Sequence, residues 1–236
     1  MTATVVLVHG AWHGAWCWDL VVGQLREQHV PVVAIDLPGH GASTEPLTDL
    51  HGHGDAVRAA LDGVDGPVVL VGHSYGGAAI TDAGDHPAVG HLVYLTAFCL
   101  DVDESIIAND LPGGEEAELA TAIEFNPDGT IAVDPTRAGD IFYADCDPAA
   151  IAAYVAKLVP EGAAGFSQTP RAVAWRDRPS TYAVCNEDRA LAPTLQRHLA
   201  ERCETTVEWR SSHSPFVSRP ELVTDLLVTL ARTVET

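Results

Sequence analysis

The sequence has little positive charge and almost no lysine. Lys157 is its only lysine, and 13 Lys and Arg residues stand against 33 Asp and Glu, which gives a formal net charge of −20 over 236 residues. A negative field of this size repels phosphate backbones and anionic lipid headgroups. We therefore expect neither nucleic acid nor a membrane surface as a partner, and we interpret the acidity as serving solubility.

Cysteine patterns and long apolar runs are also missing. The five cysteines are scattered and include no Cys-x-x-Cys pair, which argues against a disulfide framework and a zinc knuckle. No apolar run approaches the ~20 residues of a membrane span. Residues 1–4 lead into the first apolar run without the basic and apolar regions of a signal peptide. We expect a cytoplasmic protein, either a monomer or a homodimer.

The remaining composition, with 47% hydrophobic residues, 20 Gly and 15 Pro, suits one globular domain (residues 1–236) that contains an insertion. Short runs of apolar and other strand-forming residues predict six strands, at residues 5–8, 32–35, 68–71, 92–96, 181–185 and 205–209. Helical patterns separate most of them, so the chain predicts an α/β fold with a mostly parallel, doubly wound sheet. Functional sites in such sheets lie beyond the carboxyl ends of the strands.

Residues 101–179 interrupt this alternation. They carry acidic turns at 111–116 and 126–129 and a helical pattern from Asp147, without a clear strand between two helices. We predict that segment 101–179 is a mainly helical cap inserted into the domain.

The motif Gly72-His73-Ser74-Tyr75-Gly76 follows the apolar run 68–71 and leads into a run of small residues. A strand that enters a helix through Gly-x-Ser-x-Gly is typical of a nucleophile elbow, which exposes the serine hydroxyl at the end of the strand. The sequence therefore predicts Ser74 as a catalytic nucleophile. The alternative is a glycine-rich turn in which Ser74 only caps the helix.

A serine nucleophile needs a base, and the base needs an acid that orients it. His213 follows the last predicted strand and is the best candidate base. Asp188 follows the fifth strand and is the best candidate acid, with Glu187 and Asp101 as rivals. The chain order serine, acid, histidine agrees with this choice. The alternative for Asp188 is a role as a helix cap only.

An oxyanion hole requires two backbone N–H groups that point at one position. We predict that Tyr75, directly after the nucleophile, and Ala11, in the loop after the first strand, supply them. Trp12, Phe98, Phe166 and Trp175 are candidates for the wall of an apolar substrate pocket, although single aromatic residues more often belong to the core.

His40, His51 and His53 are close together in the sequence. They lack cysteine or carboxylate ligands at a recognisable spacing. No metal site is therefore expected from the sequence.

With these residues assembled, the chain resembles the α/β-hydrolase superfamily over almost its whole length. Residues 8–18, 72–77 and 187–191 resemble the plant methylesterase and hydroxynitrile-lyase branch and its bacterial esterase relatives. The resemblance implies a triad of Ser74, Asp188 and His213, oxyanion amides at Ala11 and Tyr75, no cofactor, and a helical cap over an apolar pocket for small esters.

Two departures from the lyase pattern favour an esterase. Hydroxynitrile lyases of this branch have threonine at the position of Ala11 and lysine at the position of Arg189. Our first hypothesis is a serine carboxylesterase that acts on small esters, such as aryl or methyl esters. The alternatives are a hydroxynitrile-lyase-like C–C lyase, an amide or carbamate hydrolase, and a non-catalytic small-molecule receptor.

Overall fold

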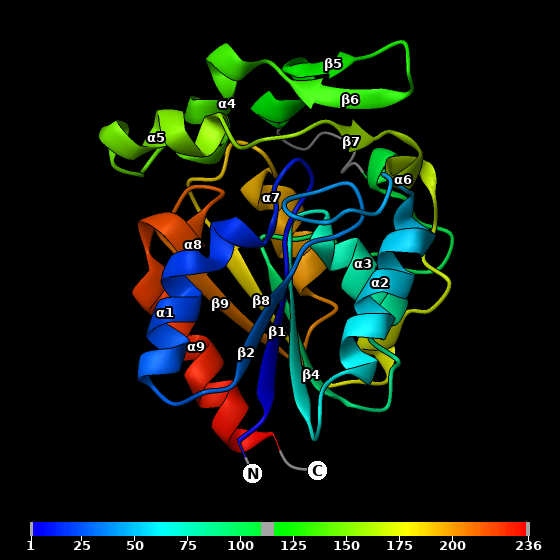
Figure 1. Cartoon of the computed structure of the whole chain (residues 1–236), viewed down its shortest axis with the longest axis vertical. Helices are drawn as coiled ribbons and strands as arrows, with labels where there is room; N and C mark the ends of the chain where they lie inside the picture. Colours follow the sequence, from blue (N-terminus) through cyan, green and yellow to red (C-terminus); the bar gives the residue numbers. More distant parts are fainter. Residues whose placement is uncertain (1, 110–115, 235–236) are drawn as a thin grey trace.

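A computed structural model describes residues 2–109 and 116–234, and its centre is a six-stranded sheet (Figure 1). The strand order is β2-β1-β3-β4-β8-β9, and every neighbouring pair is parallel. The strands are β1 (Thr4–Val8), β2 (Val32–Ile35), β3 (Val68–His73), β4 (Val89–Leu95), β8 (Ser180–Cys185) and β9 (Thr205–Trp209). This architecture confirms the predicted parallel α/β sheet and its six strands.

The chain builds the sheet outward from β1 in both directions: β2 is added on one side of β1, and β3 and the later strands are added on the other. Val8 pairs with Gly72 in the parallel register of β1 and β3. The segments that follow these residues therefore leave the sheet side by side. Ligands of open α/β sheets bind at such a change of direction, beyond the carboxyl ends of the strands.

Helices cover both faces of the sheet (Figure 1). Val5 and Leu7 face a core cluster shared with helices on one side, and Val6 and Val8 face the cluster on the other side. This alternation follows from the two-residue period of a strand. The first side has α1 (Asp19–Glu27), α8 (Pro215–Ser218) and α9 (Pro220–Thr233), and the second has α2 (Leu50–Asp62), α3 (Gly76–Ala83) and α7 (Pro193–Ala200). In the described ranges, no helix is long and apolar enough to span a membrane.

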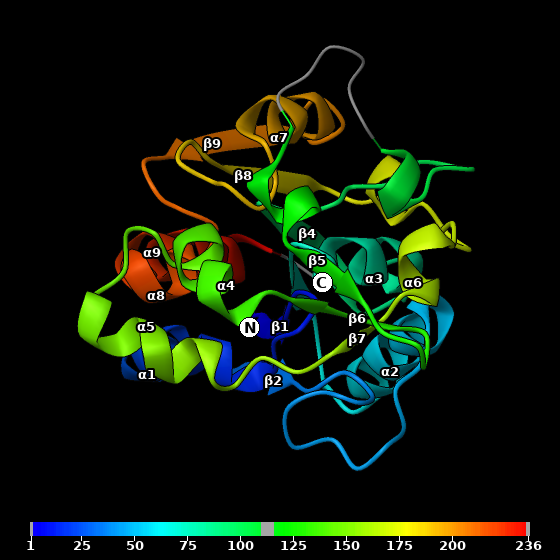
Figure 2. The same ribbon diagram turned by 90° about the horizontal axis from the view of Figure 1, so that it is seen from above.

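Residues 116–167 lie across the carboxyl ends of the strands of the main sheet (Figures 1 and 2). The helices of segment 101–179 are α4 (Pro135–Phe142), α5 (Pro148–Val155) and α6 (Ala164–Ser167), with short 3-10 turns at Ile106–Ala108, Glu118–Thr121 and Ala174–Arg176. Helix α5 begins where the sequence predicted a helix, and the Asp147 carboxylate accepts the Ala149 amide hydrogen at 3.0 Å. The predicted turn at 111–116 lies, apart from Glu116, outside the described residues.

The segment also contains an antiparallel sheet that the sequence did not predict. Strands β5 (Ile123–Phe125), β6 (Thr130–Val133) and β7 (Glu161–Gly162) pair in the order β5-β6-β7. The turn predicted at 126–129 joins β5 to β6, and Gly129 adopts a φ of +84° there. These strands are only two to four residues long, which is too short for a recognisable alternation.

Candidate active site

Ser74 occupies a strained turn between β3 and α3. Its φ is +52°, a left-handed conformation that residues other than glycine rarely adopt. A Cβ atom on Gly72 would lie 2.5 Å from the carbonyl oxygen of Gly76, and one on Gly76 would lie 2.5 Å from that of His9. Both positions therefore require glycine, and the turn has the geometry of a nucleophile elbow.

Asp188 and His213 form a buried pair. The Nδ1 atom of His213 lies 2.7 Å from Oδ2 of Asp188. Oδ1 of Asp188 accepts the backbone amides of Ala190 at 2.7 Å and Leu191 at 3.0 Å. Because the carboxylate accepts a hydrogen bond from Nδ1–H, the same tautomer leaves Nε2 with a lone pair that can accept a proton.

Two further side chains donate to Asp188, and the sequence analysis missed both. The hydroxyl of Thr96 and Nε2 of Gln196 donate to Oδ2, the latter at 3.0 Å. Thr96 directly follows β4 and has a φ of +40°, so its place at a strand end was a usable signal. Gln196 lies within α7, and nothing in its local sequence marks it.

The rival acids have other partners. Glu187 pairs with Arg210 at 2.6 Å, and Asp101 pairs with Arg176. Of the three acids considered from the sequence, Asp188 is the one hydrogen-bonded to His213.

His213 contacts His73, the residue directly before Ser74 in the elbow. The rings of His73 and His213 are 4.6 Å apart between centroids, and Nε2 of His73 donates to the carbonyl oxygen of His213 at 2.9 Å. Within residues 2–109 and 116–234, no hydrogen bond joins the Ser74 hydroxyl to His213. Catalytic hydrogen bonds often tighten only when substrate is bound.

Three buried histidines near the elbow are neutral. Burial lowers the pKa of His9 and His73 well below the usual value and lowers the pKa of His13 to about 4. Nδ1 of His13 donates to the Ala11 carbonyl oxygen at 2.8 Å, and its Nε2 lies 2.8 Å from the Tyr143 hydroxyl. His13 therefore fixes the peptide of Ala11 without adding positive charge.

Ala11 and Tyr75 lie beside Ser74 at the wall of one cavity. Both residues are buried, yet in the described part of the chain neither backbone amide donates to another protein group. Buried amides almost always have a partner. A Cβ atom on Gly10 would lie 2.9 Å from the Ser74 Cβ, so the loop approaches the serine closely. The two free amides are suited to bind an oxygen of a ligand.

The cavity has a volume of about 500 Å³ and lies between the core and segment 101–179. Trp12, Phe98 and Phe166, three of the four aromatic candidates from the sequence, line it. Most of the remaining wall is aliphatic, and the polar side chains include Asn109, Glu116 and Thr194. This size and character suit a small, mainly apolar ligand.

Trp175 does not line the cavity, so its assignment to the pocket was wrong. Its indole Nε1 donates to the Leu100 carbonyl oxygen at 2.8 Å. Arg176 and Arg202 lie over its ring at 5.5 and 5.9 Å. Trp175 packs at the edge of the core instead, because its N–H finds a backbone partner there.

The fold brings two of the three histidines considered as metal ligands together and places the third elsewhere. His40 and His53 come together with Glu161, and one ligand atom of each lies within 4.8 Å of the others. His51 points elsewhere, with Nε2 at 3.0 Å from the Thr169 carbonyl oxygen. The carboxylate missing from the local sequence therefore comes from β7.

Comparison with known proteins agrees with this fold. A family model described as "Alpha/beta hydrolase family" matches residues 5–226. "Alpha/beta hydrolase nvfD" of Aspergillus novofumigatus is 29% identical over 244 residues, which cover 94% of each chain. "Methylesterase 1" of Arabidopsis thaliana is 26% identical over 269 residues, with 96% of this chain and 95% of the relative covered. A solved pyrethroid hydrolase structure from Sphingobium faniae JZ-2 shares the fold at 24% identity, with a TM-score of 0.84 and 99% and 98% of the two chains covered.

Proposed function

The chain belongs to the alpha/beta hydrolase family, and we propose that it is a serine carboxylesterase that cleaves small, uncharged esters. The observation that carries this proposal is the left-handed backbone of Ser74 at the cavity wall. Beside it lie the amides of Ala11 and Tyr75, which donate to no group of the described residues. The similarity to a methylesterase supports ester hydrolysis.

In the proposed reaction, the Ser74 hydroxyl attacks the ester carbonyl carbon and passes its proton to Nε2 of His213. Asp188 holds Nδ1 of the resulting imidazolium. The amides of Ala11 and Tyr75 stabilise the negative charge that develops on the carbonyl oxygen.

The tetrahedral intermediate then collapses to an acyl-enzyme. His213 donates its proton to the departing alkoxide, so that the product leaves as an alcohol. A water molecule next gives a proton to His213 and attacks the acyl carbon. Collapse of this second intermediate releases a carboxylic acid and restores the Ser74 hydroxyl.

The cavity supports the choice of a small, uncharged substrate. Its volume of about 500 Å³ and its apolar wall match a compact acyl or aryl group better than a long or charged one. Glu116 at the wall and the net charge of −20 disfavour a substrate that carries a carboxylate. We propose that segment 101–179 acts as the cap that excludes water from this space.

The test combines a fluorophosphonate label, located by mass spectrometry, with p-nitrophenyl esters of increasing acyl length. We expect the label on Ser74 and the fastest turnover with short chains. Ser74→Ala should lower kcat by roughly 10⁴-fold or more, whereas Ser43→Ala, outside the cavity, should leave it unchanged.

Other outcomes distinguish the alternatives. Near-normal ester turnover by a folded Ser74→Ala variant would refute the mechanism. A label on Ser74 without turnover of any ester would point to an amide, a carbamate or a C–C bond as the substrate. Tight ligand binding without labelling or turnover would indicate a receptor.

A further inference from the structure

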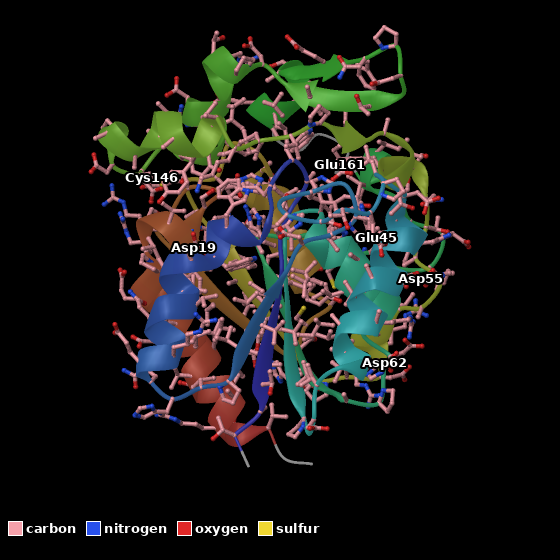
Figure 3. The ribbon with its side chains drawn as sticks, in the orientation of Figure 1. Asp19, Glu45, Asp55, Asp62, Cys146 and Glu161 are labelled. Carbon is pink, nitrogen blue, oxygen red and sulfur yellow. The ribbon has the colours of Figure 1, made fainter. Side chains whose placement is uncertain are left out.

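A second group of chemically active side chains lies buried outside the triad. His40 comes from the loop after β2, His53 from α2 and Glu161 from β7. Figure 3 labels Glu161 just below the antiparallel sheet of segment 101–179, on the side of the core. We propose that these three side chains bind one divalent transition-metal ion, Zn²⁺ or one of similar chemistry, which holds β7 against the core.

His40 has the tautomer of a metal ligand. Its Nδ1 lies 3.1 Å from the Pro38 carbonyl oxygen, and because a carbonyl can only accept, Nδ1 carries a proton. When the ring is neutral, it therefore presents a lone pair at Nε2. A backbone carbonyl that orients the second ring nitrogen is a common support of metal-bound histidine.

The lone pair of His40 faces the Glu161 carboxylate. Nε2 and Oε2 are 3.0 Å apart, but they are not aligned as a hydrogen bond, and neither atom has another partner within the described ranges. Two atoms that share a tetrahedral Zn²⁺ at about 2.0–2.2 Å lie about 3.3 Å from each other. The observed separation therefore needs only a small adjustment to accommodate one ion.

Glu161 brings a buried negative charge that needs a counter-ion. Its Oε1 accepts the Gly162 amide at 2.8 Å, and its Oε2 faces Nε2 of His40, which balances the charge only while that ring carries a second proton. No lysine or arginine of residues 2–109 and 116–234 forms an ion pair with it. An ionised carboxylate buried without a partner costs several kcal/mol. A divalent ion would supply the missing charge.

His53 completes the ligand set. Its Nδ1 lies 2.8 Å from the Tyr75 hydroxyl, and its Nε2 makes a longer contact of 3.3 Å with the Pro38 carbonyl oxygen. Because a carbonyl only accepts, Nε2 carries the proton in this contact. To bind the ion through Nε2, His53 must carry its proton on Nδ1 instead, where it can donate to the Tyr75 hydroxyl, and must give up the long contact. Two imidazoles and one carboxylate favour Zn²⁺ over Mg²⁺ or Ca²⁺, which prefer oxygen ligands.

The proposed ion would connect three parts of the chain that are far apart in sequence. It would join β7 to the loop after β2 and to α2, and His53 would link it to Tyr75, the neighbour of the nucleophile. Metal binding of this kind contributes directly to folding stability. We therefore expect Zn²⁺ to act on the stability of the protein, separately from the chemistry of Ser74.

The test uses the whole chain without an affinity tag. The protein is unfolded in urea with a chelator, refolded with or without Zn²⁺, and freed of excess metal, because a buried site fills best during folding. Elemental analysis should find about one zinc per chain, and the zinc form should unfold at a higher temperature. Refolding with Co²⁺ should produce the visible absorption of a tetrahedral complex with nitrogen and oxygen ligands.

Three variants locate the ion. Glu161→Gln and His40→Gln should each weaken Zn²⁺ binding by more than about 100-fold, whereas His51→Gln, on the same helix as His53, should bind like the parent. Absence of bound zinc and of the Co²⁺ absorption in the parent protein would overturn the proposal and assign the contact to a protonated His40. Equal zinc binding by a folded Glu161→Gln variant would also overturn it. Neither measurement depends on esterase activity.

Discussion

Nε2 of Gln196 donates a hydrogen bond of 3.0 Å to Oδ2 of Asp188, the same oxygen that lies 2.7 Å from Nδ1 of His213. Oε1 of Gln196 accepts the Cys185 amide at 2.8 Å, so the side chain is fixed to the end of β8. Gln196 is completely buried. Its contacts set the orientation of the Asp188 carboxylate, so in the proposed mechanism Gln196 is a positioning residue.

We expect Gln196→Met to lower kcat for p-nitrophenyl acetate by about 10-fold with little change in KM, because the base loses its orientation while the cavity wall is kept. The free energy of unfolding should fall by about 1–3 kcal/mol, since the Cys185 amide loses its acceptor. Gln24→Met is the matched control, because Gln24 bonds to Thr224 on the far side of the sheet. Equal kcat values for the two variants would remove Gln196 from the positioning role.

Substitution by alanine should have opposite effects at Gly10 and at Gly23. A Cβ atom on Gly10 would lie 2.8 Å from Nδ1 of His73 and 2.9 Å from Cβ of Ser74, whereas one on Gly23 would have no neighbour within 4 Å. Gly10→Ala should therefore displace the elbow and lower both activity and thermal stability. Gly23→Ala, within α1, should raise stability by about 0.5–1 kcal/mol at unchanged activity. Full activity of Gly10→Ala would contradict the close approach of this loop to Ser74.

Because of its buried histidines, the protein should have a lower free energy of unfolding in acid. His13 has a pKa of about 4 in the folded chain, lowered by burial from 6.5. Between these values the unfolded state binds more protons, so the free energy of unfolding decreases as the pH falls from about 6.5 to 4. His13 alone accounts for about 3 kcal/mol, and His9 and His73 act in the same direction.

Urea unfolding at a series of pH values measures this effect. His13→Gln should reduce the slope of stability against pH in this window, whereas His198→Gln, on the surface of α7, should leave it unchanged. A stability that stays constant from pH 6.5 to 4 would show that these histidines are not neutral in the folded protein.

Phe98 lines the cavity, and Phe125 is 81% exposed on β5. Phe98→Ala should enlarge the cavity and move the preferred p-nitrophenyl ester toward a longer acyl chain, seen as a change in the ratio of kcat/KM values. The backbone amide of residue 98, which donates to the Ser74 carbonyl oxygen, is retained. Phe125→Ala should leave the ratio unchanged, and an unchanged ratio in both variants would place the acyl group elsewhere.

Much of the fold could be predicted from local patterns. Five strands of the main sheet are short, mainly apolar runs, as expected for a parallel sheet covered on both faces. The sixth, β9, is an edge strand with polar, exposed positions, and its β-forming residues are its signal. The short strands of segment 101–179 could not be predicted in this way. Strand β7, of two residues, exists only because β6 lies beside it.

In the candidate site, too, some residues could be placed from the sequence and others only from the fold. Ser74, Ala11, Tyr75 and Trp12 follow strand ends, where topology alone brings residues together. Trp175 was assigned to the pocket from its residue type, and only the direction of its side chain in the fold shows that it packs against Leu100 instead.

The sequence by itself determined the parallel sheet and the Gly-x-Ser-x-Gly turn, because hydrophobic period and glycine sterics act over a few residues. The tertiary structure alone decided which acid meets His213, that Thr96 and Gln196 support this acid, and that Glu161 reaches His40 and His53. These contacts join segments that are distant in the chain, and their distances depend on how the helices and segment 101–179 pack, which no local pattern records.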